Sequence, residues 1–344
     1  MNILMIGPNM KAKGGMATVI KNMYHFKGVD NFKVLDNWQE NHRFLPFIKN
    51  CLFLRKKIRD ENIDIVHFHV AQKGSFYRKS ILLFLLPKKI KTIFHMHASQ
   101  FDLFYQASSK VKKNYIRKSL NRADLIVAVS ENWKNFYKKI TDTQIDFINN
   151  AVEVSADNKY QPESQCILTL GRIGERKGTF DLIEVAKRIG KKYPSITFEV
   201  YGDGEIDKFK DLTAHMPNIK INGWINQEKK EQILQNTLLH FLPSYNEGLP
   251  MAILETMSCG IPNIATTVGG IPQLITDNED GFLVKPGEIE IMCEKILYYL
   301  EVNQIDKTKI SKKATEKIKN NYSLENYMSQ WHSRYIRLMK EDLN

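Results

Sequence analysis

The sequence predicts an α/β protein of two domains, each a parallel β-sheet wrapped by helices. Its 344 residues exceed one ordinary hydrophobic core and suit two domains of about 150 to 180 residues each. Short apolar runs alternate with stretches of helical periodicity, which is the pattern of parallel strands joined by crossover helices. Residues 154–164 are polar and aperiodic, and we expect the linker between the domains there.

The first domain is predicted over residues 1–155. Its strands are expected at Ile3–Gly7, Phe32–Asp36, Ile63–His69, Lys91–His95, Asp124–Val129 and Ile145–Asn149. Candidate helices separate them, near residues 16–26, 45–60, 75–86, 108–121 and 131–139.

The second domain is predicted over residues 160–322. Its strands are expected at Cys166–Leu170, Thr197–Tyr201, Lys220–Asn222, Leu238–Leu242, Asn263–Ala265 and Phe282–Val284. Helices are expected near residues 178–193, 205–215, 227–236, 250–258 and 287–302. The last ~35 residues also have helical periodicity, carried by Tyr327, Trp331, Tyr335 and Ile336.

Charge divides unevenly between the two predicted domains. Residues 1–150 hold 26 Lys and Arg against 11 Asp and Glu, a net charge of +15, whereas residues 151–344 hold 24 against 27, a net charge of −3. This asymmetry indicates an anionic partner for the first domain: nucleic acid, anionic lipid or an acidic substrate.

Targeting signals and cysteine spacing favour a protein of the bacterial cytoplasm. The best candidate for a membrane span, Ile81–Leu86, is six residues long, whereas a span needs ~20 apolar residues. Met1–Gly7 lacks a basic segment and a cleavage site, so we expect a buried strand there and no signal peptide. The four cysteines are isolated, which predicts reduced thiols and no metal site: Cys51, Cys166, Cys259 and Cys293.

A glycine pair, Gly14 and Gly15, opens the helix that follows the first strand. Glycine has no Cβ, so backbone N–H groups here can approach an anion at the positive end of the helix dipole. The segment is neither a Walker loop nor G-x-G-x-x-G. The residues alone therefore leave a plain tight turn open as the alternative.

Three cations, Arg172, Arg176 and Lys177, follow the first strand of the second domain. Fixed cations beside a departing diphosphate stabilise the transition state more than the ground state, because negative charge grows there as the bond breaks. A basic residue at a helix N-terminus opposes the dipole, so we expect an anion nearby. Ordinary solvated charge is the alternative.

Two carboxylates, Glu247 and Glu255, lie eight positions apart where a loop turns into a helix. The amides of Gly248, Leu249 and Met251 lie at that helix N-terminus and can bind a phosphate oxygen or a sugar hydroxyl. Carboxylates facing cations suggest a ligand that is diphosphate at one end and polyol at the other, which describes a nucleotide sugar. Two surface glutamates are the alternative.

His97 follows an apolar strand of the first domain, and side chains at a strand's carboxyl end point into the ligand crevice of an open α/β sheet. Three further histidines, His67, His69 and His95, share the neighbourhood. Two-residue strand spacing places His67 and His69 on one face. No carboxylate pair accompanies them, so we predict no metal site, with zinc as the alternative.

These motifs resemble the retaining glycosyltransferases of family 4, whose fold is called GT-B. The family pattern G-R-x-x-x-x-K-G is met by Gly171, Arg172, Lys177 and Gly178, and the resemblance covers nearly the whole chain. It implies two Rossmann-like domains facing a deep interdomain cleft, with a final helix, about 324–344, that crosses back to the first domain. The first domain would lie on the acceptor side, and the second would bind the nucleotide sugar.

The resemblance also implies a role for each motif. Gly14, Gly15, Arg172 and Lys177 would contact the donor diphosphate, His97 and Glu247 the donor sugar, Glu255 the ribose hydroxyls, and Gly202 would lie beside the base. Gly248, Leu249 and Met251 complete the predicted donor site, and His97, Glu247, Arg172 and Lys177 form the predicted catalytic set. Two residues depart from the family pattern: Ala98 replaces a glycine and Gln273 replaces a glutamate.

The implied reaction transfers a hexose or N-acetylhexosamine from a nucleotide sugar, most readily a UDP-sugar, to a hydroxyl with retained configuration. The sequence has no D-x-D motif, so we expect neither metal nor cofactor, with Arg172 and Lys177 in the metal's place. The expected acceptor is a lipid-diphosphate-linked saccharide of capsule or O-antigen assembly. The protein would then act on the inner face of the bacterial cytoplasmic membrane.

A basic surface on the first domain is the expected contact with anionic membrane, at ~1 kcal/mol per basic residue. The predicted cations flank Phe76, Tyr77, Leu82 and Tyr115; they are Arg78, Lys79, Lys88, Lys89, Lys91, Lys112, Lys113, Arg117 and Lys118. A solvated basic face is the alternative. A non-catalytic protein that binds nucleic acid or an anionic surface is the other function class. It would leave Glu247 and Glu255 unexplained and lacks the usual motifs, so we expect no nucleic acid partner.

Overall fold

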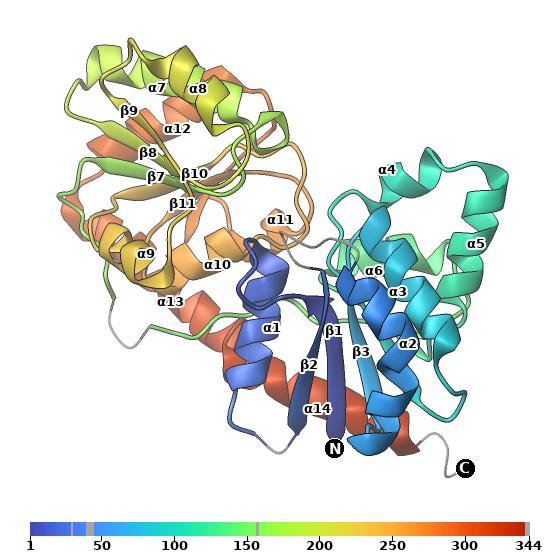
Figure 1. Cartoon of the computed structure of the whole chain (residues 1–344). Helices are drawn as coiled ribbons and strands as arrows, with labels where there is room; N and C mark the ends of the chain where they lie inside the picture. Colours follow the sequence, from blue (N-terminus) through green and yellow to red (C-terminus); the bar gives the residue numbers. More distant parts are fainter. Residues whose placement is uncertain (29, 39–44, 156–157, 341–344) are drawn as a thin grey trace. The chain divides into compact units, whose positions relative to one another are not determined.

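The computed structural model describes residues 1–28, 30–38, 45–155 and 158–340, and they form two compact units. Unit 1 holds the residues up to Ala151 together with the described residues from Leu324 onward, and unit 2 is Val152–Ser323. Two predictions extend past the described residues: the linker over 154–164 includes 156–157, and the last helix over about 324–344 includes 341–344. Each unit contains one six-stranded parallel sheet (Figure 1).

Unit 1 is a sheet in the order β2-β1-β3-β4-β5-β6. All six predicted strands of this unit form. The apolar runs of β1, β3, β4 and β5 are buried on both faces of the sheet, whereas the edge strands β2 and β6 are mostly part-buried. The strands are β1 (Asn2–Pro8), β2 (Asn31–Trp38), β3 (Ile65–Val70), β4 (Lys91–Met96), β5 (Leu125–Ala128) and β6 (Ile145–Phe147).

Helices connect these strands at the predicted places, with one short addition after β4. They are α1 (Gly15–His25), α2 (Leu45–Asp60), α3 (Gly74–Leu85), α4 (Phe101–Gln106), α5 (Lys110–Leu120) and α6 (Glu131–Lys138). The sequence analysis did not anticipate α4, because six residues are too few to establish a helical period.

The C-terminal helix α14 (Leu324–Lys340) belongs to unit 1, as the resemblance implied. Figure 1 shows it in red beside the blue strands of this unit. Trp331 and Tyr335 are completely buried, and Tyr327 is almost so. The chain therefore leaves unit 1 after Ala151 and returns to it with an amphipathic helix whose apolar face completes the core.

Unit 2 repeats the architecture with the order β12-β11-β10-β7-β8-β9. Its strands are β7 (Cys166–Leu170), β8 (Thr197–Tyr201), β9 (Ile219–Asn222), β10 (Leu239–Leu242), β11 (Asn263–Thr266) and β12 (Gly281–Val284). Its helices are α7 (Thr179–Lys192), α8 (Ile206–Thr213), α9 (Gln227–Leu234), α10 (Met251–Ser258), α11 (Ile271–Leu274), α12 (Ile289–Glu301) and α13 (Gln304–Asn321), with a 3-10 turn η1 (Glu175–Lys177) before α7.

The strand orders explain where a ligand site can form. In unit 2 the chain begins at β7 inside the sheet, continues outward to β8 and β9, and then returns to β10 on the other side of β7. This reversal makes a topological switch point between β7 and β10, and loops at the carboxyl ends of the strands diverge there. In unit 2, the predicted donor-binding residues come from the loops that follow β7, β8 and β10 and from helix α10.

Candidate active site

Lys177 and Glu247 form the centre of the predicted donor site in unit 2. Lys177 ends η1 after β7, and Glu247 lies in the loop between β10 and α10. The Lys177 ammonium donates a hydrogen bond to Glu247 Oε1, and both side chains are largely buried, with 14% and 7% of their surface exposed. The Ser244 hydroxyl donates to the same oxygen at 2.8 Å. The sequence analysis expected an anion beside Lys177. Without a ligand, the carboxylate of Glu247 is that anion.

The turn at Gly178 holds Lys177 in place. Gly178 has φ of 70°, and a Cβ there would lie 2.0 Å from the carbonyl oxygen of Pro243. Only glycine permits both the left-handed conformation and this backbone approach. The turn after β7 is consequently pressed against the end of β10, which brings Lys177 within reach of Glu247.

Arg172 is placed differently from Lys177, although both belong to the same motif. Its side chain is 64% exposed, and Nη1 lies 3.4 Å from Asp203 Oδ2 in the loop after β8. A long hydrogen bond between exposed groups constrains the guanidinium weakly. Arg172 can therefore turn toward an anionic ligand with little loss of stability.

Gly202 lies where the loops after β7 and β8 touch. A Cβ at this position would lie 1.8 Å from the carbonyl oxygen of Gly171, and the Gly171 amide donates to Tyr201 O at 3.0 Å. This close approach explains the glycine without a ligand. The predicted contact of Gly202 with a nucleotide base stays a prediction.

The loop before α10 carries the predicted amide donors. Pro250 is the N-cap of α10, so Met251 begins the helix and Gly248 and Leu249 precede it. The Gly270 amide donates to Gly248 O at 2.7 Å, and a Cβ on Gly269, which has φ of 58°, would lie 2.0 Å from Glu247 O. The loop between β11 and α11, which contains Gly269 and Gly270, thus fixes the backbone conformation at Glu247.

Glu255 lies one helical turn inside α10, where its Oε1 accepts a hydrogen bond from Lys230 Nζ at 2.9 Å. The two side chains are similarly sheltered, at 18% and 19% exposure. Glu255 is held in one place but keeps an exposed fraction. It can therefore accept a hydrogen bond from a ligand hydroxyl.

Gly14 and Gly15 lie at the start of α1 in unit 1. Gly14 is the N-cap, with φ of 115°, and, apart from its two chain neighbours, no described residue has an atom within 4 Å of where its Cβ would be. The first turn of α1 has no acidic residue. Its positive end therefore faces open space, as an anion site requires, although the conformation alone also explains a glycine.

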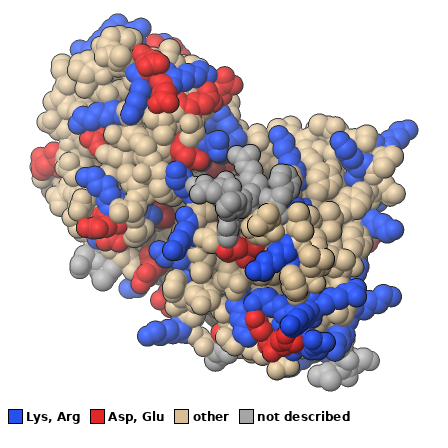
Figure 2. Space-filling model, in the orientation of Figure 1, with Lys and Arg blue, Asp and Glu red and all other residues tan. Residues whose placement is uncertain are grey.

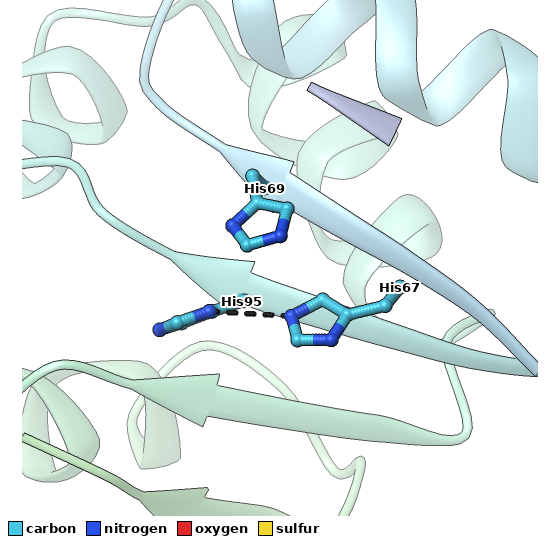
Figure 3. Close-up of side chains that lie close together, drawn as sticks. All are labelled: His67, His69 and His95. Atoms are coloured by element: carbon cyan, nitrogen blue, oxygen red, sulfur yellow. Dashed lines mark hydrogen bonds between the residues drawn. The ribbon is translucent and has the colours of Figure 1, made fainter. Parts of the chain in front are cut away.

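His67, His69, His95 and His97 of unit 1 form one layer on the sheet, and Figure 3 shows the first three of them. His67 and His69 stack with ring centroids 4.5 Å apart at 6°, which confirms that they share a face of β3. His67 Nε2 lies 3.2 Å from His95 Nδ1, and His69 Nδ1 lies 3.0 Å from His97 Nε2. His97, which follows β4, is therefore positioned by the imidazoles of His69 and His95.

The C-terminal helix closes this histidine layer. The Tyr335 hydroxyl lies 2.8 Å from His67 Nδ1, and the Trp331 ring lies 4.4 Å from the His67 ring and 4.8 Å from the His95 ring, between centroids. No local sequence pattern links β3 to a helix 268 positions further along the chain. Only the fold brings them together.

Burial keeps the histidine layer neutral. Desolvation lowers the pKa of His67, His69 and His95 well below the ordinary 6.5, and with the nearby Lys79 it lowers the pKa of His97 to about 3. Neutral imidazoles can both donate and accept hydrogen bonds, so His97 is suited to bind a sugar hydroxyl.

Nitrogen atoms of His67, His69 and His95 all lie within 4.8 Å of one another, which is the arrangement a metal ion would need. However, both ring nitrogens of His67 already have hydrogen-bond partners. In the described part of the chain, His69 Nε2 and His95 Nε2 are buried without a hydrogen-bond partner. A metal ion could use those two nitrogens, whereas binding to His67 would break one of its hydrogen bonds.

The sequence analysis missed Lys79 as part of this environment and assigned it to the basic surface. Lys79 is only 2% exposed and its ammonium donates to Ser75 Oγ at 2.8 Å. Burial and the neighbouring Arg78 lower its pKa to about 7. Phe76 and Leu82 are completely buried as well, so they cannot contact a membrane. The surface prediction was wrong for these three residues because every third or fourth position of α3 faces the sheet.

Comparison with known proteins gives the family. The chain matches the description "Glycosyltransferase Family 4" over residues 27–156 and "Glycosyl transferases group 1" over residues 153–318. A relative is the UDP-Gal:alpha-D-GlcNAc-diphosphoundecaprenol alpha-1,3-galactosyltransferase of Escherichia coli, 26% identical over 327 residues that span 87% of this chain and 82% of that protein.

Two solved structures show the same fold. Sucrose-phosphate synthase from Thermosynechococcus elongatus superposes with a TM-score of 0.80 at 15% identity, covering 99% of both chains. A TarM variant of S. aureus in complex with fondaparinux, alpha-GlcNAc-glycerol and UDP has a TM-score of 0.72 at 22% identity; it covers 84% of this chain, which spans 58% of TarM. The chain belongs to the family 4 glycosyltransferases and is a retaining enzyme of the GT-B fold.

Proposed function

We propose that this enzyme transfers a hexose or N-acetylhexosamine from a UDP-sugar to a hydroxyl of a lipid-diphosphate-linked saccharide. The observation that supports it best is the buried Lys177–Glu247 pair at the switch point of unit 2, with Arg172 free to turn beside it. The pair offers a cation for a diphosphate and a carboxylate for sugar hydroxyls in one place. The E. coli relative, whose printed name includes UDP-Gal and a diphosphoundecaprenol-linked sugar, supports this donor and acceptor class.

The roles follow from charge. Arg172 and Lys177 stabilise the negative charge that grows on the departing UDP as the glycosidic bond breaks. Glu247 orients the donor sugar, Glu255 binds the ribose hydroxyls, and the neutral His97 hydrogen-bonds the sugar. The acceptor hydroxyl attacks the anomeric carbon from the face that UDP leaves, and its proton passes to the leaving phosphate oxygen, so configuration is retained.

The acceptor and the basic charge of unit 1 suggest where the enzyme acts. Among the described residues, no helix has both the length and the apolarity to cross a membrane. Unit 1 includes residues 1–150, whose net charge is +15. We infer a peripheral enzyme that meets its acceptor at the inner face of the bacterial cytoplasmic membrane, in the synthesis of a surface polysaccharide.

The experiment is a panel of radiolabelled nucleotide sugars tested for hydrolysis, and for transfer to polyprenyl-diphosphate-linked saccharides. We expect turnover with one or a few UDP-sugars, and loss of that turnover in Glu247→Gln. A strong preference for donors with another base would disprove the UDP assignment. Efficient transfer only to soluble saccharides would disprove the lipid-linked acceptor.

A further inference from the structure

Helix α2 exposes an apolar face that nothing in the sequence analysis anticipated. Leu45, Ile48, Leu52 and Phe53 are 71%, 56%, 72% and 53% exposed. Residues 45, 48 and 52 recur at intervals of three and four, so they lie along one side of the helix. The opposite side is buried through Asn50, Leu54 and Ile58. The helix therefore has two apolar sides, and only one of them packs on unit 1.

Cations surround this exposed side. Helix α2 contains five Lys and Arg against the single acid Asp60. Four of the five are exposed: Lys49, Arg55, Lys56 and Arg59. Together with the four exposed apolar residues they are called the α2 face below. Figure 2 shows Lys and Arg gathered over the part of unit 1 where Figure 1 draws α2.

The end of α3 extends the α2 face. Arg55 Nε donates to Leu85 O at 2.7 Å, which ties the two helices together at this surface. Near that point Ile81 and Phe84 are 42% and 40% exposed. Lys88 and Lys89, just after the helix, are exposed too. The same combination of apolar side chains and cations thus continues across two neighbouring helices.

We infer that the α2 face docks on an anionic lipid bilayer, lying in the interface with Leu52 and Phe53 inserted among the headgroups. The inference rests on the proposed function, which requires a lipid-linked acceptor, and it names the surface that function would use. An apolar stripe with a cationic border is the composition of interfacial helices. The exposed Lys and Arg of the α2 face favour a lipid bilayer over a protein groove as its partner. These side chains can lay their apolar stems over the surface while their charged ends reach lipid phosphates.

The test measures sedimentation of the full chain with vesicles of phosphatidylcholine alone or mixed with phosphatidylglycerol. The variant is the double substitution Leu52→Ser and Phe53→Ser. The matched control is Ile305→Ser in α13 of unit 2, where the side chain is 71% exposed and similarly apolar. We expect the double variant to bind mixed vesicles at least roughly tenfold more weakly, since each buried apolar side chain contributes to interfacial affinity. The control should bind as the wild type does.

A second variant tests the charges: Lys49→Ser, Arg55→Ser and Lys56→Ser together should flatten the fall of binding with salt. Unchanged donor hydrolysis and thermal unfolding in each variant would show that the fold is intact, as expected for exposed side chains.

Each other outcome has a defined meaning. If the double variant binds mixed vesicles like the wild type, the α2 face is not the docking surface, while the proposed membrane partner stands. If the wild type binds neither kind of vesicle, both the inference and that partner are overturned. If the wild type is a dimer by light scattering that the double variant converts to a monomer, and vesicles do not bind, then a second copy of the chain covers the α2 face.

Discussion

Lys177 and Glu247, seventy positions apart in the chain, form a hydrogen-bonded ion pair with little access to water. Removing two charges from water is costly, and the attraction between the partners, together with the hydrogen bond from the Ser244 hydroxyl, offsets that cost. A donor diphosphate that reaches Lys177 therefore meets an ammonium whose position is already fixed. Preorganisation of this kind is what makes a cation effective on charge that develops in a transition state.

The first prediction follows from that pair. Lys177→Ala should lower kcat by roughly 10²–10⁴-fold, because it removes charge stabilisation that grows as UDP leaves. Lys192→Ala, which breaks an exposed ion pair with Glu301, is the control and should leave kcat unchanged. A change confined to KM would show that Lys177 binds ground and transition states equally.

Lys177→Ala also leaves a buried carboxylate without its cation, so stability must be measured beside activity. The double variant Lys177→Met with Glu247→Gln removes both charges. If it unfolds like the wild type, any instability of Lys177→Ala comes from its unpaired carboxylate, and kcat of the single variant is compared with the wild type under conditions where both are folded. Recovery of activity in the double variant would mean that the single substitution acted only through misfolding.

The second prediction concerns Glu255. Glu255→Gln should weaken binding of the UDP-sugar by roughly tenfold or more in calorimetry, since hydrogen bonds to a charged group contribute about 1.5–3 kcal/mol. The fold should remain intact. Glu290→Gln in α12 breaks a surface pair with Arg188 and serves as the control. Wild-type affinity in Glu255→Gln would refute its assignment to the ribose.

The third prediction concerns metal. We propose that Arg172 and Lys177 supply the positive charge at the diphosphate, and on that proposal turnover should continue in excess EDTA. The measurement is the initial rate of transfer before and after chelation. Activity that disappears with EDTA and returns with manganese would assign the leaving-group stabilisation to a metal ion.

The fourth prediction uses the histidine layer. Burial lowers the pKa of His67, His69 and His95 in the folded protein, so below pH 6.5 the unfolded chain binds more protons than the folded one. The contribution of these three histidines to stability should therefore be constant above that pH and fall as the pH decreases below it. Each histidine should contribute a slope of about 1.4 kcal/mol per pH unit.

His67→Gln tests this prediction by urea unfolding at several pH values. It should reduce the slope of the unfolding free energy against pH, below pH 6.5, by the contribution of one histidine, about 1.4 kcal/mol per pH unit. His215→Gln, at an exposed position of unit 2, is the control and should not change it. An unchanged slope in His67→Gln would locate the acid sensitivity outside the layer.

The sequence by itself determined the two-sheet architecture and the places where chemistry could occur. Apolar runs mark buried parallel strands and need no partner to be recognised, so all the strands of unit 1 were predicted. The motifs from Gly171 to Gly178 and from Glu247 to Glu255 could also be recognised as candidate ligand-binding segments from the sequence. Each combines glycine, charge and a helix start within a few residues.

Only the tertiary structure decided which of these residues meet. The Lys177–Glu247 pair depends on β7 and β10 being neighbours and on the contact of Gly178 with Pro243, and the closure of the histidine layer depends on α14 returning to unit 1. Local periodicity tells which side of a helix is apolar but not which apolar side is covered. For that reason Phe76 and Leu82 were assigned to the surface although they are buried, and the exposed Leu52 and Phe53 of α2 were passed over. Burial is a property of what packs against a residue, and the fold alone supplies that neighbour.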